Sequence, residues 1–250
     1  MLPKFIEDPT GLKFEDLQNN DWQLIKLNIT VNTEYAMEWV RSVKDTFQDC
    51  AFTWDQAHLI NDDAYEHYQS QVKKLLVRTE NDQPEQWALQ WSYQRDGVLP
   101  FVSNKIANPN LFPETLSESF FHDWNQILEK YYHGFWKEYH QTLGEDVFKV
   151  TRLVRFPKEC GLNTHKDTGA DQPFLIRMHT VPSIGPNHFF NYGEDLGEDC
   201  YHMEPGCTYL LNTGIVHSAI NHDEIDWWML HNNPTDDAVT RLMNTRMHIE

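Results

Sequence analysis

The segment from Arg152 to Asp167 constrains this chain more than any other, because it puts a histidine and a carboxylate two residues apart. Its first half predicts a strand, and the strand runs into a turn that presents His165 and Asp167. Residues i and i+2 of an extended segment point to the same face, so this imidazole and this carboxylate can hold one ion. A charged pair on a surface turn is the alternative, since about one His-x-Asp triplet is expected by chance.

A third ligand is offered by the segment from Glu204 to Ala219. A turn at Gly206 is followed by an apolar strand to Asn212, a second turn, and then His217. In a double-stranded β-helix, a late strand in this place faces the first ligand pair across the barrel mouth. Two histidines and one carboxylate form the facial triad of non-haem Fe(II) oxygenases, which leaves coordination positions open. We therefore predict that His165, Asp167 and His217 bind Fe(II).

From about Arg152 to Asn232 the chain resembles the aspartyl/asparaginyl β-hydroxylase family, which includes free-proline hydroxylases. Four motifs carry the resemblance in the same order: Arg152-x-x-Arg155, His165-Lys-Asp167, Phe174-Leu-Ile-Arg177-Met-His179, and Gly206 through His217-Ser-Ala. Four motifs in sequence are more specific than any one alone.

The resemblance implies a jelly-roll enzyme that uses Fe(II), O₂ and 2-oxoglutarate, and that releases succinate and CO₂. Its substrate would be a free amino acid, or an Asp, Asn or Pro side chain of a peptide or protein. Halogenases of the wider superfamily lack the carboxylate ligand, so the presence of Asp167 favours hydroxylation.

Three residues are candidates for binding the acidic co-substrate or substrate. Arg177 and His179 share one face of the predicted strand 174–181, and the resemblance implies that an Arg-x-His here lies near the iron. Arg152 and Arg155 point to opposite faces of a regular strand. The resemblance puts a basic or polar residue inward at Arg152, so we expect Arg155 to form an ion pair at the surface.

One position departs from the family pattern. Family members carry an arginine about ten residues after the last histidine ligand, and it binds the far carboxylate of 2-oxoglutarate, whereas this chain has Trp227 there. A buried dicarboxylate without a cationic partner is unfavourable. Arg177, Arg152 or a tail arginine (Arg241 or Arg246) could replace the missing arginine. Two other readings stay open: a cupin-like metalloenzyme that does not use 2-oxoglutarate, and a non-catalytic jelly-roll binding module.

Two further His-x-Glu pairs have the spacing of metal ligands, His202 with Glu204 and His222 with Glu224. Neither precedes a strand–turn–strand pattern that would place a third ligand opposite, so we predict that neither binds the metal.

Charge and cysteine content limit the partners and the compartment. The net charge of −18 argues against nucleic acid or an anionic membrane as a partner, because the phosphate interaction would be repulsive. The 4 cysteines have no CxxC spacing, which favours reduced thiols. No apolar run is long enough for a membrane span, and the first residues lack a signal-peptide pattern. We expect a cytoplasmic protein, and nothing in the sequence indicates its oligomeric state.

A chain of 250 residues has the length of one catalytic domain with an extension, or of two small domains. The fold class is mainly β with flanking helices (α+β), built on a double-stranded β-helix core over 146–232. Residues 1–145 form an N-terminal helical and strand extension, and 233–250 form a tail with a short helix. Within these parts we expect strands at 22–31, 86–97, 147–156, 174–181, 188–192, 206–212 and 225–231. Helices are expected at 34–44, capped by Asn32 and Thr33, at 63–77, and over the aromatic segment 114–144 with a break.

Overall fold

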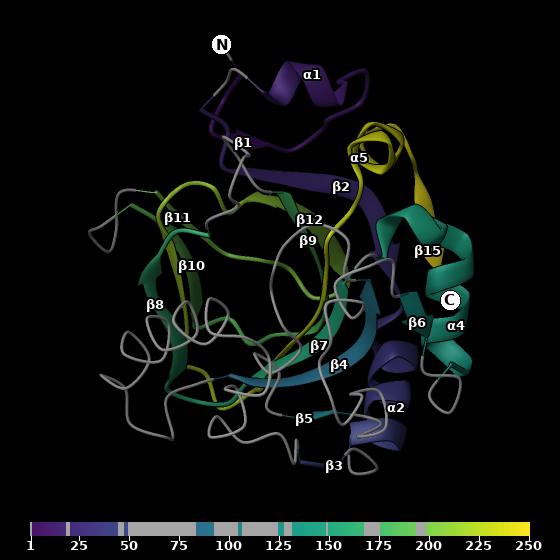
Figure 1. Cartoon of the computed structure of the whole chain (residues 1–250). Helices are drawn as coiled ribbons and strands as arrows, with labels where there is room; N and C mark the ends of the chain where they lie inside the picture. Colours follow the sequence, from purple (N-terminus) through teal and green to yellow (C-terminus); the bar gives the residue numbers. More distant parts are fainter. Residues whose placement is uncertain are drawn as a thin grey trace, which may run out of the picture.

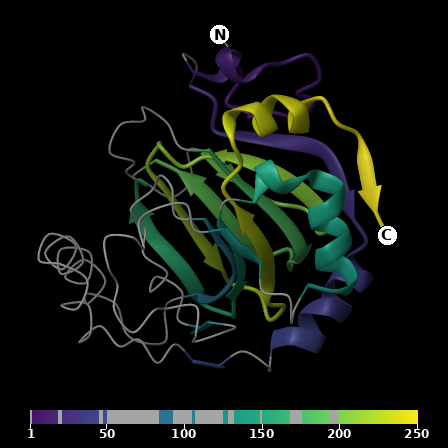
Figure 2. The same cartoon turned by 45° about the vertical axis from the view of Figure 1, so that its right-hand side comes forward.

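The computed structural model describes residues 2–18, 21–44, 48–49, 84–92, 105–106, 125–127, 132–148, 150–167, 176–193 and 199–250. Two β-sheets form the body of this part of the chain, and helices lie along one side of it (Figures 1 and 2). The helices are α1 (Phe14–Leu17), α2 (Thr33–Val43), α4 (Gly134–Leu143), the short 3₁₀ helix η7 (Glu145–Val147) and α5 (Asp236–Met243).

The larger sheet is 11-stranded and runs in the order β1-β2-β12-β9-β14-β7-β4-β5-β3, with β15 pairing to β2 and β6 to β4. Its strands are β1 (Phe5–Ile6), β2 (Leu24–Val31), β3 (Gln48–Asp49), β4 (Glu85–Ser92), β5 (Lys105–Ile106), β6 (Asn125–Ile127), β7 (Val150–Phe156), β9 (Ile176–Ser183), β12 (Cys207–Asn212), β14 (Trp227–Asn232) and β15 (Met247–Ile249).

The smaller sheet is 4-stranded, in the order β11-β10-β13-β8. It contains β8 (Cys160–His165), β10 (His188–Tyr192), β11 (Asp199–Tyr201) and β13 (His217–Asn221). Buried side chains of both sheets belong to one apolar cluster, with Phe190 and Ala219 from the small sheet and Leu211 and Met229 from the large one. The two sheets therefore face each other across a shared core.

The outer face of the large sheet is covered by helices. Helix α2 begins where the Asn32 side chain accepts a hydrogen bond from the Tyr35 N–H, which satisfies one of the donors left open at a helix start. Its buried residues are Ala36, Trp39, Val40 and Val43, the face expected from the sequence. These residues join Phe135, Trp136 and Tyr139 of α4 in a second core cluster against the sheet.

The predicted strand at 22–31 and the predicted helix at 34–44 are confirmed, as β2 and α2. The strands expected at 188–192, 206–212 and 225–231 correspond to β10, β12 and β14. The tail contains the expected short helix, α5, which is followed by strand β15 in parallel with β2. The helix expected at 63–77 lies outside the described residues.

The prediction of one broken helix over 114–144 was wrong in part. Residues Asn125–Ile127 form β6, which pairs antiparallel with β4, and the described helix starts only at Gly134. His133 is extended, and Gly134 has a positive φ of 53°, so the backbone cannot run into α4 as a continuous helix. Helical spacing of the aromatic residues predicted a helix here, but pairing with β4 makes Asn125–Ile127 a strand.

The expected helical extension over 1–145 is not confirmed. Strand β2 pairs with β12 near one end of the large sheet, and β4 pairs with β7. Residues before 145 thus supply sheet strands in addition to α1, α2 and α4.

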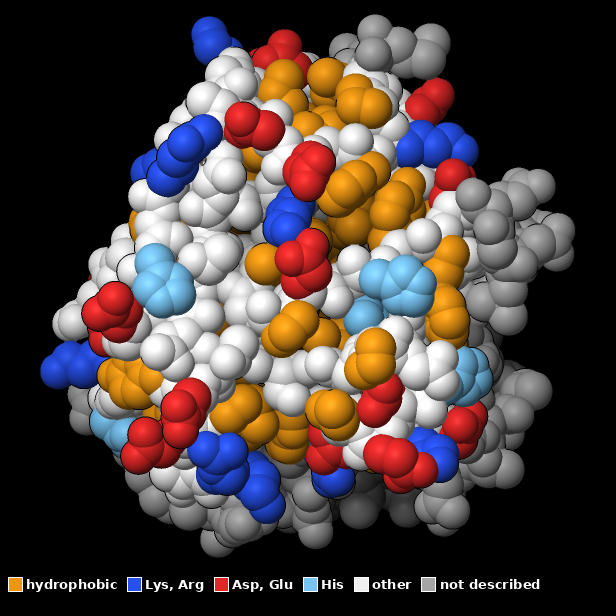
Figure 3. Space-filling view, turned by 180° about the vertical axis from the view of Figure 1, so that it is seen from behind, with side chains coloured by type: hydrophobic (Ala, Val, Ile, Leu, Met, Phe, Trp, Pro, Cys, Tyr) orange, Lys and Arg blue, Asp and Glu red, His pale blue; other side chains and the backbone are white. Residues whose placement is uncertain are grey.

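On the face seen from behind, basic side chains are interspersed with acidic ones and with apolar side chains (Figure 3). No helix of the described residues is long and apolar enough to cross a membrane.

Candidate metal centre

His165, Asp167 and His217 converge at one end of the small sheet. His165 ends β8, Asp167 follows two residues later, and His217 begins β13. The Cα atoms of His165 and His217 are direct partners in the β8–β13 pair. One ligand atom from each of the three side chains lies within 4.8 Å of the other two, and the described residues contain no other group of this kind.

Local backbone structure positions the two ligand segments. The β8–β13 register shifts between His217 and Ala219, because Ala219 pairs with Leu162 while His217 pairs with His165. Such a bulge re-aims side chains beside it and is frequent next to active sites. The Asp167 N–H donates to the Thr213 carbonyl at 3.0 Å, which ties the segment after β8 to the turn before β13.

His217 has a defined tautomer. Its Nδ1 lies 2.8 Å from the carbonyl oxygen of Ile215, which can only accept, so Nδ1 carries the hydrogen and Nε2 presents its lone pair. The ring stacks on Phe190 at 5.7 Å between centroids and is only 3% exposed. Burial first, and the neighbouring His165 second, lower the pKa of His217 to about 4. The imidazole is therefore neutral at pH 7, as a metal ligand must be.

Asp167 is held as a carboxylate mainly by the neighbouring Arg177 guanidinium. Its Oδ2 lies 3.3 Å from Nε of Arg177, and its Oδ1 lies 3.6 Å from Nε2 of His165. Burial raises the pKa of this carboxyl group, but Arg177, His217 and His165 together outweigh burial, and the pKa is lowered. Two imidazole nitrogens and one ionised carboxylate oxygen are the donor set that suits Fe(II) with coordination positions left open. The residues present therefore fit the metal predicted from the sequence.

A row of polar side chains crosses the inner face of the large sheet. Arg152 of β7 pairs with His231 of β14, and His231 pairs with His179 of β9. Directly opposed residues of antiparallel strands point to the same face, and His179 packs edge-on against Phe190 of the other sheet at 6.4 Å. Arg152 and His179 therefore face inward, as expected.

Arg177 and His179 are both buried, at 7% and 6% exposure. The structure thus places Arg177 directly beside Asp167, and His179 two residues along the same strand face.

Arg155 points to the opposite face. Its Nε lies 2.7 Å from Oδ2 of Asp226, and its guanidinium lies over the Trp228 ring at 5.7 Å. The expectation that Arg155 forms an ion pair at the surface is met.

The position of the missing arginine is filled by packing. Trp227 is fully buried and stacks on Phe156 at 4.9 Å. The two tail arginines are engaged elsewhere, Arg241 with Asp146 at 2.6 Å and Arg246 near Asp8 at 3.9 Å. Helix α5 packs in the same core cluster as α2 and α4. This structure therefore does not support Arg241 or Arg246 as a replacement for the missing co-substrate arginine.

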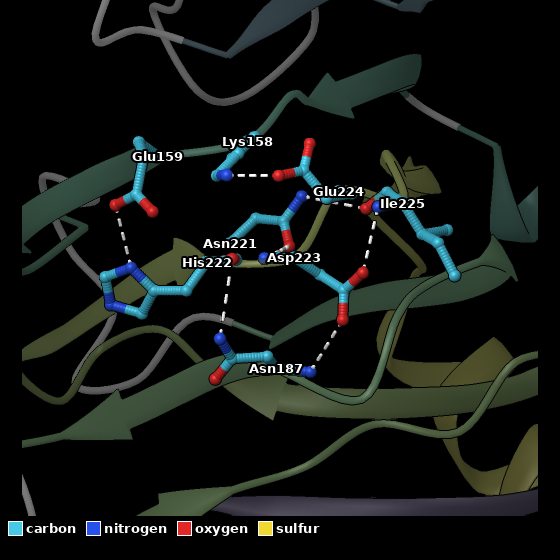
Figure 4. A network of polar contacts seen from close by, with 8 residues as sticks. All are labelled: Lys158, Glu159, Asn187, Asn221, His222, Asp223, Glu224 and Ile225. Carbon is cyan, nitrogen blue, oxygen red and sulfur yellow. Dashed lines mark hydrogen bonds and ion pairs between the residues drawn. The ribbon is translucent and has the colours of Figure 1, made fainter.

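In each of the two other His-x-Glu pairs, the histidine and the glutamate contact different residues. His222 contacts Glu159, while Glu224 contacts Lys158, in a surface network organised by hydrogen bonds to Asp223 and Asn221 (Figure 4). His202 packs against the rings of His188 and Phe189, and Glu204 pairs with Lys26. Neither pair belongs to a described group of three ligand side chains.

His231 was not singled out by the sequence analysis. Its Nδ1 lies 3.0 Å from Nε2 of His179, so the two imidazoles form a hydrogen-bonded pair. The period-two alternation from Trp227 through Met229 places His231 on the inner face, which was the available signal. What the sequence lacked was the strand order that brings β14 beside β9.

No protein-family model matches the chain, and no curated protein matches it. Three solved structures show a remote likeness. A 2OG-Fe(II) oxygenase family oxidoreductase from Burkholderia pseudomallei has 9% identity and a TM-score of 0.34, covering 76% of this chain and 94% of that one. A Pseudomonas putida prolyl-4-hydroxylase has 10% identity and a TM-score of 0.31, covering 76% and 91%. The protein IDO from Bacillus thuringiensis has 11% identity and a TM-score of 0.33, covering 81% and 98%.

Proposed function

We propose that the chain is an Fe(II)- and 2-oxoglutarate-dependent dioxygenase that hydroxylates an amino acid, free or within a polypeptide. One observation carries this proposal: the convergence of His165, Asp167 and His217 within 4.8 Å. When bound, Fe(II) would supply the redox chemistry that couples decarboxylation of 2-oxoglutarate to hydroxylation of a C–H bond by O₂.

The protein side chains would set up this centre before the metal arrives. His217 presents Nε2 because its Nδ1–H is fixed on the Ile215 carbonyl. Asp167 supplies the negative charge, and Arg177 keeps that charge in place through Oδ2. A ligand oriented by a second hydrogen bond binds metal more tightly, so Arg177 and the Ile215 carbonyl support the triad indirectly.

Recognition of the acidic co-substrate would fall to Arg177, Arg152 and His179. All three belong to the inner face of the large sheet, toward the triad. A carboxylate that enters this space loses its hydration, and a buried carboxylate needs a charged, hydrogen-bonding partner. Arginine fulfils that need better than lysine because its planar guanidinium matches the carboxylate geometry.

The substrate class is proposed from the family resemblance, namely Asp, Asn or Pro, either free or as a residue of a peptide. One observation favours a second function, a cupin-like metalloenzyme that does not use 2-oxoglutarate. That observation is Trp227, which fills with an apolar ring the place where family members carry the co-substrate arginine.

The decisive measurement is turnover of 2-oxoglutarate by the Fe(II)-loaded protein, with O₂ uptake and succinate formation followed together. Free aspartate, asparagine and proline and peptides that contain them are supplied as substrates, and hydroxylated product is detected by mass spectrometry. We expect succinate and O₂ uptake in equal amounts, and loss of both in Asp167→Ala. His222→Ala serves as the matched control. O₂ uptake without succinate would favour the cupin-like enzyme, and bound iron without either would favour a binding module.

A further inference from the structure

The turn between β12 and β13 contacts two of the three candidate metal ligands through its main-chain carbonyl groups. The Thr213 carbonyl accepts the N–H of Asp167 at 3.0 Å, and the Ile215 carbonyl lies 2.8 Å from Nδ1 of His217. His217 itself follows the turn as the first residue of β13. The position of this turn therefore helps to set the positions of the Asp167 carboxylate and of Nε2 of His217.

Asn212, the last residue of β12, shapes the turn from within. Its Oδ1 accepts the N–H of Gly214 at 3.2 Å, and its main-chain carbonyl accepts the N–H of Ile215 at 3.4 Å. An asparagine side chain that accepts from the main chain two residues later forms an Asx turn, which fixes the local path of the backbone. Asn212 is only 4% exposed, so water competes little for these bonds.

The other end of the same amide anchors the turn to a distant segment of the chain. Nδ2 of Asn212 donates to the Trp22 carbonyl at 3.1 Å, and the Asn212 N–H donates to the Gln23 carbonyl at 3.0 Å. Both residues are buried and come just before β2. The Trp22 carbonyl can only accept and the Gly214 N–H can only donate, so these two partners determine the orientation of the amide. Neither a carboxylate nor an apolar side chain could satisfy both.

The strand beside β13 is tied to the same segment. The Tyr192 hydroxyl of β10 donates to the Gln23 carbonyl at 2.6 Å. Tyr192 is also the direct Cα partner of His217 in the β10–β13 pair. The Gln23 carbonyl thus receives one hydrogen bond from the turn that precedes His217 and one from the strand that pairs with it.

We propose that Asn212 is a positioning residue of the metal centre, and that its amide fastens the turn to Trp22 so that Asp167 and His217 are held at ligand spacing. The inference rests on the proposed function only in taking the triad as the metal site. It needs neither 2-oxoglutarate nor a particular substrate. Partners that orient metal ligands without touching the metal contribute about 10- to 100-fold in metal affinity.

The chain contains a matched control at the other end of β13 from His217. Asn221, the last residue of that strand, is fully buried, and its Oδ1 accepts the Asp223 N–H at 3.0 Å, again two residues later (Figure 4). Its Nδ2 donates to the Phe156 carbonyl at 2.8 Å and to the Ile225 carbonyl at 3.0 Å. Asn221 thus makes the same two kinds of hydrogen bond as Asn212, an Asx turn and an anchor to a distant carbonyl.

Zn(II) is a redox-inert probe of the triad, and its dissociation constant is measured by titration calorimetry on the full chain. We expect Asn212→Ala to raise this constant on the order of 10-fold or more. Asn221→Ala should leave it within about 3-fold, although both variants lose buried hydrogen bonds and should unfold at lower urea concentration. Lower stability alone changes the apparent constant only through the folded fraction, which circular dichroism measures.

Asn212→Ser separates the two bonds, and it takes the place of Asn212→Ala if the alanine variant does not fold. Serine keeps a side-chain oxygen that can accept the Gly214 N–H, but it is too short to reach the Trp22 carbonyl. Because the anchor to Trp22 fixes the turn, we expect Asn212→Ser to weaken Zn(II) binding nearly as much as Asn212→Ala. Unmodified affinity in folded Asn212→Ser would overturn the role of the anchor.

A second readout needs no metal. Hydrogen exchange of the Asp167 amide in the metal-free protein reports how firmly the Thr213 carbonyl holds it. We expect this exchange to be on the order of 10-fold faster in Asn212→Ala than in the unmodified protein or in Asn221→Ala. Unchanged exchange would mean that no effect of Asn212 passes through the turn, which would also overturn the proposal.

Two outcomes of the Zn(II) titrations reject this inference alone: unchanged affinity in Asn212→Ala, or an equal loss in Asn221→Ala. In both cases the unmodified protein still binds Zn(II), so the metal centre of the proposed function stands. If the unmodified protein does not bind Zn(II), the metal centre is rejected, and the proposed function and this inference fail with it.

Discussion

His165 and His217 are direct partners across the β8–β13 strand pair, and their ring centroids lie 4.3 Å apart. Two imidazoles at this distance can direct nitrogen lone pairs toward one metal ion. A metal ion held between them would accept a lone pair from both rings and from Asp167.

The first prediction concerns this triad. His165→Ala, Asp167→Ala and His217→Ala should each lower Fe(II) affinity by more than about 100-fold, because loss of a residue that only orients a ligand already lowers metal affinity 10- to 100-fold. Metal content after anaerobic loading and desalting measures the loss, with circular dichroism as the test of folding. Stoichiometric Fe(II) in folded Asp167→Ala or His217→Ala protein would show that the triad is misassigned.

The second prediction concerns the two other His-x-Glu pairs, His202 with Glu204 and His222 with Glu224. His202→Ala and His222→Ala should leave the Fe(II) content unchanged, because His222 contacts Glu159 at the surface and His202 packs against aromatic rings. The same loading assay applies. Loss of iron from either folded variant would mean that another His-x-acid pair holds the metal.

The third prediction separates the arginines. Arg177→Ala should weaken 2-oxoglutarate binding by at least a few hundred-fold, since removing one partner of a buried charge pair leaves the other stranded, at about 3–5 kcal/mol. Arg152→Ala should give a separate, measurable loss through the neighbouring strand. Arg155→Ala is the matched control and should change affinity little, because its partner Asp226 lies at the surface.

Calorimetric titration of 2-oxoglutarate into the three Zn(II)-loaded variants tests this order. Arg177 also contacts Asp167, so Zn(II) affinity is measured alongside to separate loss of the metal from loss of the co-substrate. A large effect of Arg155→Ala alone would contradict the inward and outward assignments of β7.

The sequence was sufficient for local features that depend on nearest neighbours along the chain. The Asn32 cap and the buried stripe of α2 follow from helix periodicity, and the inward or outward direction of Arg152 and Arg155 follows from strand alternation. The three residues of the candidate centre could be named because His165 and Asp167 share a short spacing and His217 follows a recognisable turn.

The pairing of strands that are distant along the chain could not be predicted from the sequence. Strand β2 pairs with β12, and no residue near Leu24 specifies that partner strand. The same limit hid His231, whose contact with His179 exists only because β14 and β9 are neighbours. Asn125–Ile127 was assigned to a helix because the aromatic and apolar residues of 114–144 recur at helical spacing, whereas pairing with β4 makes this segment a strand.

The last prediction concerns acid stability of the metal-free protein. His179 has a folded-state pKa of about 3, lowered mainly by burial from the ordinary histidine value of 6.5. Below pH 6.5 the unfolded chain takes up a proton at this ring and the folded chain does not. The free energy of unfolding therefore falls as the pH falls from about 6.5 toward 3, by about 1.4 kcal/mol per pH unit from this group.

His217 and His231, whose pKa values are also lowered, act in the same direction, so the slope of the unmodified protein is a sum. His179→Asn removes one member of that sum while it keeps a polar group at the position of Nδ1. Urea unfolding with a chelator present, at pH 7, 6 and 5, should give an average slope smaller by about 1 kcal/mol per pH unit in the variant. Asp167 does not interfere, because its pKa is lowered below 3.8 and it titrates outside this range. Identical slopes in the two proteins would mean that the folded protein binds a proton at His179 as readily as the unfolded chain does.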